Sequence, residues 1–284
     1  MKLPIPFFAV FISFAVCFFQ TACDSILNEM KDYDEILNLD ESHETVELSV
    51  SQLVERMQEA TDPKGVWRNC KGYYMRQSAW TEEKKGRSRV EEYWVQEIRF
   101  RQPGQVRQTF SRENAVFKTM LLTDGRVWNI DHDNQFSEVT GSEGTRLYKR
   151  MVGFSNPKET ELSLFAKVEL GVIYEDGKRY YRMICRAEDD SIPPYVKYID
   201  PDTFLVKRVE TIVAGGDGLS CLYKAESKEY KWIHDIKIAT KTSVTIGNER
   251  SEDYIIEDFK IDPAFASDTF TLPAASQIDY TKSK

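Results

Sequence analysis

The sequence has few of the residues from which catalytic centres are built. Its 284 residues include three histidines, His43, His132 and His234, and these are far apart. The H-E-x-x-H pattern of zinc proteases and the G-x-S-x-G turn of serine hydrolases are both absent. Because no possible nucleophile has a base near it in the sequence, we predict that the protein is not an enzyme and has no catalytic residues and no cofactor.

Cysteine is also scarce in the part of the chain that is expected to fold. Cys70, Cys185 and Cys221 are too far apart for the C-x-x-C spacing of a zinc or redox site. They allow at most one disulfide, and we expect mainly buried thiols. The segment 131–134 offers oxygen and imidazole groups in a row, but it lacks the glycine and the distal glutamate of a calcium loop, and its composition is that of a hairpin tip. We therefore predict no metal site.

The expected folded part lacks an excess of positive charge. The whole sequence holds 38 basic and 46 acidic residues. Nine of the acids and a single base, Lys31, lie between residues 24 and 48, so this segment is strongly acidic. From Ser49 onward, 36 basic residues stand against 37 acidic ones. A nucleic-acid-binding protein needs basic groups for the phosphates, and nucleic acid is therefore not an expected partner.

The N-terminus has the pattern of a bacterial export signal. Lys2 precedes an uncharged run from Ile5 to Phe19, which is short for a membrane span of ~20 residues, although an uncleaved anchor is the alternative. Small residues then precede Cys23, an order similar to the lipobox of bacterial lipoproteins, whose cysteine is acylated after cleavage. The resemblance implies a signal peptide over residues 1–22 and a lipid anchor on Cys23. The charge pattern predicts an acidic tether over 23–48, and residues 49–284 are expected to form a single domain.

An acylated chain of this kind belongs to the bacterial cell envelope and faces the periplasm, with its membrane attachment made by lipid. Asp24 follows the cysteine directly. Under the enteric sorting rule, an aspartate at this position favours the inner membrane, but the rule does not hold in all bacteria. The choice between inner and outer membrane therefore stays open.

Replacing Cys23 by serine is expected to release the protein from membranes, because one acylation site supplies the attachment. Membrane fractionation of the wild-type and Cys23→Ser chains measures this release. Metabolic labelling with a fatty-acid analogue that persists in the variant would contradict a lipid anchor at this residue.

Beyond the tether, a helix pattern is followed by strand patterns. Ser49 and Gln52 have the spacing of a capping box, and a one-sided apolar helix follows until Pro63 ends it. From Tyr93 to Phe100 apolar residues alternate with polar ones, as in a half-buried strand. Pairs such as Asp124-Gly125 mark hairpin turns. About eleven strand candidates, each with one solvent-facing side, predict an α+β fold that is mainly antiparallel β, with one curved sheet or barrel.

Two helical stretches interrupt the strands between Glu143 and Lys167. The first carries Leu147, Met151 and Phe154 on one face, and the second continues to Val168. A strongly curved sheet has one concave apolar face, and an amphipathic helix that crosses it would cover that face. The helices are then either a lid over a cavity or permanent core helices with no cavity beneath them. The sequence leaves both interpretations open.

Several segments, taken in order, resemble a known family. A basic strand with a Pro-Gly turn at Phe100–Arg107 is followed by the D-G-x-x-W-x-x-D pattern in Leu122–Asp131, and Tyr198–Val209, Phe259–Pro263 and Phe270–Pro273 come later. This order is similar to that of outer-membrane lipoprotein-sorting proteins, the LolA/LolB-like superfamily. The resemblance covers most of the domain. It implies an unclosed, roughly eleven-stranded β-barrel with helices covering the concave face and an apolar cavity for acyl chains.

Parity and bulk select the residues expected to line that cavity. The candidates on the strands are Trp94, Ile98, Phe100, Met120, Leu122, Trp128 and Met183, and those on the lid are Leu147, Met151 and Phe154. The expected partners are acyl chains of a lipoprotein or lipid and the membrane that holds the anchor, and sorting or transfer of lipoproteins is one use of such a cavity. The alternative is a non-catalytic regulatory or scaffold lipoprotein that binds other envelope proteins through the same fold with a filled interior.

Overall fold

A computed structural model describes residues 46–85, 88–188, 192–214, 220–247 and 250–273 of the chain. The predicted signal peptide, Cys23 and the tether before Val46 lie outside the described residues. The lipid anchor therefore stays a prediction. Over the described part, no helix combines the length and the apolar character needed to cross a membrane.

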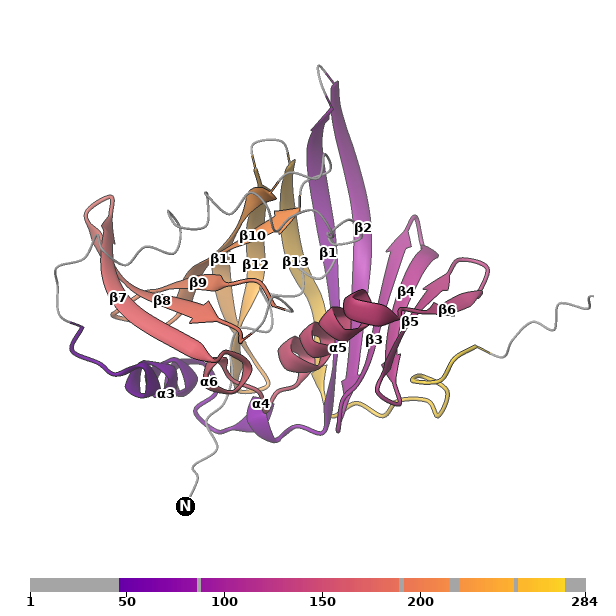
Figure 1. Cartoon of the computed structure of the whole chain (residues 1–284), viewed down its shortest axis with the longest axis horizontal. Coiled ribbons are helices and arrows are strands. Elements are labelled where there is room, and N and C mark those ends of the chain that lie inside the picture. The colour runs from indigo at the N-terminus through magenta and orange to yellow at the C-terminus, as the bar shows by residue number, and fades with distance from the viewer. Residues whose placement is uncertain (1–45, 86–87, 189–191, 215–219, 248–249, 274–284) are drawn as a thin grey trace, which may run out of the picture.

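The described residues form one curved antiparallel sheet of thirteen strands (Figure 1). The strands, in the order in which they lie side by side, are β6 (Phe136–Glu138), β5 (Arg126–Asp131), β4 (Ala115–Thr123), β3 (Gln105–Arg112), β2 (Ser88–Arg101), β1 (Gly72–Lys85), β13 (Arg250–Ile261), β12 (Ile236–Ile246), β11 (Ser220–Ile233), β10 (Val206–Ala214), β9 (Tyr195–Ile199), β8 (Lys178–Arg186) and β7 (Lys167–Glu175).

The two outer strands, β6 and β7, end the sheet at opposite edges and are not paired with each other. The barrel is therefore unclosed, as predicted, and the mainly antiparallel α+β class is confirmed. The described residues form thirteen strands rather than about eleven. One cause of the difference is β7, which begins inside a stretch whose apolar spacing had the period of a helix.

The Asp124-Gly125 turn joins β4 to β5 as predicted. Both residues have positive φ, at 50° and 73°, which is the backbone of the two-residue turn that matches the twist of antiparallel strands. The turn fixes the pairing of Thr123 with Arg126, and Leu122 then lies opposite Val127. This register decides which face each later side chain of β5 occupies.

Helix α3 (Val50–Thr61) covers one end of the concave face. The predicted capping box is present, because the Ser49 side chain accepts from the Gln52 amide and the Gln52 side chain accepts from the Ser49 amide. One face buries Leu53, Val54 and Met57. The helix packs against β7 and β12, and the four-residue helix α4 (Val66–Asn69) leads from it into β1.

Helix α5 (Gly141–Ser155) crosses the concave side of the other half of the sheet, in front of β3 (Figure 1). It packs against β3 and β5. The second predicted helix is shorter than expected: α6 (Glu161–Leu164) ends at Leu164, and Val168 lies in β7. The prediction of helix at Val168 was therefore wrong. The β-branched and aromatic residues that follow it favour a strand.

The expectation that every strand has one solvent-facing side is also wrong near the β7 edge of the sheet. All five residues of β9 are buried, and Ile184, Val196 and Tyr198 form a second apolar cluster on the side away from the main core. Long polar side chains cover this cluster. The Tyr198 hydroxyl donates to Glu210 at 2.8 Å, and the Arg208 guanidinium lies 3.7 Å from the centre of the Tyr198 ring.

Candidate functional site

The concave face gathers most of the predicted cavity residues. Alternation along β2 places Trp94, Ile98 and Phe100 on this face, and all three are buried in the main core. The register of β2, β3 and β4 aligns Phe100 with Val106 and Leu122, and Ile98 with Gln108 and Met120. Met183 lies on β8, in the other half of the sheet, and is buried in the same core.

Trp128 does not belong to this set. In β5 it pairs with Leu121, whereas Val127 pairs with Leu122, so Trp128 faces the convex side of the sheet. Its ring is half-buried and meets Phe136 edge to face, with 5.8 Å between the ring centroids. The prediction that Trp128 lies on the concave face was wrong, because the hairpin register puts Val127 there and bulk alone does not decide the face.

Aromatic rings pack closely on the concave face where α4 meets β1, β2 and β13. The Tyr73 ring lies 4.8 Å from Trp67 and 5.4 Å from Phe100, between ring centroids. Phe259 adjoins both Trp67 and Tyr73. Rings at these distances form a dense core, so the structure places Phe100 in packed core rather than beside open space.

All three predicted lid residues of α5 point into the core. Met151 and Phe154 are almost completely buried, and Leu147 is nearly so. The Phe154 ring meets Tyr195 of β9 edge to face at 5.4 Å between centroids. Because α5 also packs against β3 and β5, this one helix links two parts of the sheet that are far apart in strand order.

A buried ion pair fastens the segment after α5. Lys197 of β9 donates to Glu161 at the start of α6, and both residues are 1% exposed. Lys197 pairs with Met183 in the register and so lies on the concave face. The Thr160–Ser163 capping box orients α6 so that Glu161 points inward. The pair joins α6 to β9, and separating its partners would leave a buried charge uncompensated.

By contrast, α5 itself is weakly built. Two of its interior residues, Gly144 and Gly153, are glycines, which lower helix stability by about 1 kcal/mol each relative to alanine, and its first residue, Gly141, has a φ of 69°, outside the helical range. Among the described residues, Thr140 gives its first turn no side-chain cap. A hollow of about 310 Å³ borders its N-terminal half and one of about 290 Å³ its C-terminal half, and Tyr148 borders both. Helix α5 therefore has the features of an element that opens locally before the rest of the domain.

A row of amide side chains also crosses the concave face, and the sequence analysis missed it. The amide row consists of Gln77 on β1, Gln96 on β2, Gln108 on β3 and Asn129 on β5. The register aligns Gln77 with Gln96, and it aligns Gln108 and Asn129 with Met120 of β4 between them. Gln96 and Gln108 fall on the buried parity of their strands, which is the sequence signal that could have identified them.

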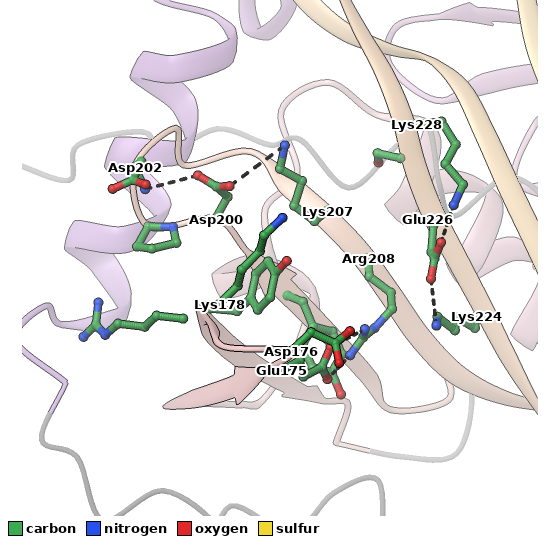
Figure 2. Close-up of a pocket in the computed structure, with 15 residues that line it drawn as sticks. Glu175, Asp176, Lys178, Asp200, Asp202, Lys207, Arg208, Lys224, Glu226 and Lys228 are labelled. Atoms are coloured by element: carbon green, nitrogen blue, oxygen red, sulfur yellow. Dashed lines mark hydrogen bonds and ion pairs between the residues drawn. The ribbon is translucent and has the colours of Figure 1, made fainter.

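A separate hollow of about 950 Å³ lies on the convex side, over the β7–β8 turn and β9 to β11 (Figure 2). Its lining is charged, and Figure 2 shows that the charges are largely paired with one another. Arg208 donates to Glu175 at 2.6 Å, and Lys207 lies 4.0 Å from Asp200. Hydrogen bonds from Lys224 and Lys228 lower the pKa of Glu226 to about 2. This hollow is too polar for an acyl chain.

The cysteines of the described residues are mainly buried thiols. Cys70 and Cys185 are buried free thiols and Cys221 is partly buried, in agreement with the prediction of mainly buried thiols. Burial raises the pKa of Cys70 and of Cys185 to about 12, so both are protonated at neutral pH. Within the described ranges, His, Cys, Asp and Glu form no group of three or more that could hold a metal ion.

Comparison of the whole structure with solved structures identifies the fold. A LolA superfamily protein of Nitrosomonas europaea superposes with a TM-score of 0.53 at 10% identity, covering 79% of this chain and 98% of that one. A putative outer membrane lipoprotein-sorting protein domain of Vibrio parahaemolyticus gives 0.52 at 9% identity, with 77% and 94% covered. A DUF1329 family protein of Desulfovibrio piger gives 0.50 at 14% identity, with the same coverage.

The fold is therefore that of the LolA superfamily, an open antiparallel barrel with helices on its concave side, and the predicted fold resemblance is confirmed. No protein-family profile and no curated protein sequence matches the chain. At identities of 9 to 14% the likeness concerns the fold alone. What the concave face binds has to be argued from its own residues.

Proposed function

We propose that the protein is a lipid-anchored lipoprotein of the bacterial envelope that binds acyl chains of a lipoprotein or lipid on its concave face, in lipoprotein sorting or transfer. The observation that supports this proposal is the contrast between the face and its cover. The face is mainly apolar, with the amide row and the Lys197–Glu161 pair as its polar parts, whereas α5, which covers it, has three glycines and an uncapped first turn within the described chain. An apolar surface under a weakly held helix suits a hydrophobic ligand.

Binding requires that α5 give up its own contacts. Leu147, Met151 and Phe154 fill the face in the closed state, so α5 has to open to admit an acyl chain and then close over it, which buries methylene groups at ~0.8 kcal/mol for each CH₂. Helix α3 does not share this weakness, because its capping box is complete. The ion pair between Lys197 and Glu161 holds α6 in place. Opening is thus expected at α5 alone.

Replacing Gly144 by alanine is expected to strengthen the binding of a hydrophobic probe about fivefold. An added Cβ would lie 2.2 Å from the backbone oxygen of Val139, so the first turn of α5 must move away from Val139, and this clash is expected to outweigh the higher helix propensity of alanine. If this lowers the free energy of opening by ~1 kcal/mol, the open population that can bind the probe rises about fivefold, and the apparent affinity rises with it. Titration of the full-length chain with a neutral fluorescent naphthylamine, combined with hydrogen exchange of the α5 amides, measures both changes.

Ser142→Ala is the matched control, because Ser142 is an exposed residue of the same turn. It should change neither probe affinity nor exchange. If Gly144→Ala instead lowers global stability while probe affinity stays at the wild-type value, α5 is a fixed part of the core and the lid interpretation fails.

The alternative of a regulatory or scaffold lipoprotein has one observation in its favour. Trp80 and Tyr93 are 55% and 40% exposed and pack on each other on the convex side of the long β1–β2 hairpin, which projects beyond the other strands (Figure 1). Exposed aromatic pairs are typical of protein contact sites. In a crosslinking experiment in intact cell envelopes, this alternative predicts a crosslink between the wild-type chain and another envelope protein that the Trp80→Ser/Tyr93→Ser chain loses. That loss, together with a wild type that takes up no hydrophobic probe, would favour this alternative.

A further inference from the structure

The amide row leaves hydrogen-bonding groups unused in the interior. Gln77 donates from Nε2 to Oε1 of Gln96, at 2.5 Å. The remaining Nε2 of Gln96, both amide atoms of Gln108 and Oδ1 of Asn129 are buried and have no hydrogen-bond partner among the residues that the structure describes. Gln108 is 0% exposed. The row thus offers both donors and acceptors to whatever reaches the face.

These groups stand in otherwise apolar surroundings. Gln108 lies between Ile98 and Met120 on the neighbouring strands, with Val106 and Phe110 before and after it on its own face. A leucine or methionine at this position would complete the core, whereas a buried amide without partners lowers stability. The fold therefore carries a polar group where packing alone favours an apolar one.

The row lies under the part of the cover that is expected to move. Helix α5 packs against β3 and β5, the strands that carry Gln108 and Asn129. Displacement of α5 would uncover these amides together with the apolar side chains around them. Gln96, diagonal to Gln108 across the β2–β3 pair, is within reach of the same ligand, because diagonal neighbours lie about 7–8 Å apart.

We propose that the amide row recognises the neutral carbonyl linkage, an ester or amide, by which an acyl chain is joined to its carrier. This inference rests on the proposed function and adds a ligand class to it. The amide N–H groups of Gln96 and Gln108 donate to the carbonyl oxygen, and the Oε1 of Gln108 accepts from an amide N–H where the ligand has one. All four members of the row are uncharged. The row therefore suits a neutral ester or amide better than the carboxylate of a free fatty acid.

A matched pair of ligands tests this directly. Monolauroylglycerol and 1-O-dodecylglycerol have the same chain length and the same head group, and they differ in the carbonyl alone. Each is used to displace the neutral naphthylamine probe from the full-length chain carrying Cys23→Ser, which removes the predicted acylation site. The wild-type interior is expected to prefer the ester about fivefold, the effect of roughly one net hydrogen bond.

Gln108→Met is expected to abolish this preference while the ether binds as before. Methionine has nearly the length of glutamine without its amide, and thermal unfolding should show that the variant is at least as stable as the parent. Thr109→Val is the control, since Thr109 is buried on the opposite face of β3. It should keep the preference.

The experiment distinguishes failure of the proposed function from failure of the carbonyl recognition. If neither glycerolipid displaces the probe, or the probe does not bind at all, the proposed function fails and this inference with it. If both lipids bind the wild type equally, the recognition of a carbonyl is overturned and acyl binding stands. A preference for the ester that persists in Gln108→Met also overturns the role of the amide row. A stronger preference for lauric acid than for its glyceryl ester overturns the ligand class.

Discussion

Replacing Lys197 by methionine is expected to lower the free energy of unfolding by about 3–5 kcal/mol, because the Glu161 carboxylate then stays buried without its partner. Both residues are 1% exposed, so the carboxylate that remains is shielded from water. Urea denaturation followed by tryptophan fluorescence measures the loss.

The double variant Glu161→Leu/Lys197→Met should recover most of that stability, because an apolar pair of similar volume needs no desolvation. Lys207→Met is the control: it removes a lysine from the half-exposed ion pair with Asp200, where the expected change is within about 1 kcal/mol. A Lys197→Met chain as stable as the wild type would contradict the assignment of the pair to the core. A double variant as unstable as the single one would show that packing, not charge, sets the loss.

Replacing Met151 by aspartate is expected to abolish measurable binding of the hydrophobic probe, with a loss of affinity of roughly 100-fold or more, while the sheet stays folded. Met151 is completely buried on the inner face of α5. An aspartate there has to be desolvated when the helix closes over a ligand, and an unpaired carboxylate costs several kcal/mol to bury. Probe titration measures the binding, and circular dichroism measures the retained β structure.

Ser142→Asp places the same charge on an exposed position of α5 and should leave probe binding unchanged. This outcome separates burial of the charge from its mere presence on the helix. If Met151→Asp unfolds outright and the wild type takes up no probe, α5 is core and the carrier function is wrong.

Local patterns predicted much of this fold, because they depend on neighbours in sequence. The Ser49 capping box and the Asp124-Gly125 turn each involve a few adjacent residues, and both are present. Alternation along β2 predicted the buried face of Trp94, Ile98 and Phe100. The order of these segments also predicted the open barrel, which the comparisons with solved structures bear out.

Features that depend on long-range pairing were missed. Val168 continued the apolar spacing of the preceding helix, and its pairing with Cys185 makes it a strand residue. Trp128 was placed by its bulk, whereas the register with β4 decides its face. The charge pair of Glu161 and Lys197 joins residues 36 positions apart, and nothing in either local sequence indicates the other partner. The amide row likewise exists only across four strands.

Native mass spectrometry of the full-length chain carrying Cys23→Ser, purified from cell envelopes in mild detergent, tests most directly whether the interior binds acyl chains. The predicted result is a bound species whose added mass is that of an acylated ester or amide and which organic extraction releases; the same species should be missing from the Met151→Asp chain. A wild-type chain that carries only detergent, with no acyl compound in the extract, would contradict acyl binding and leave the concave face as a filled core.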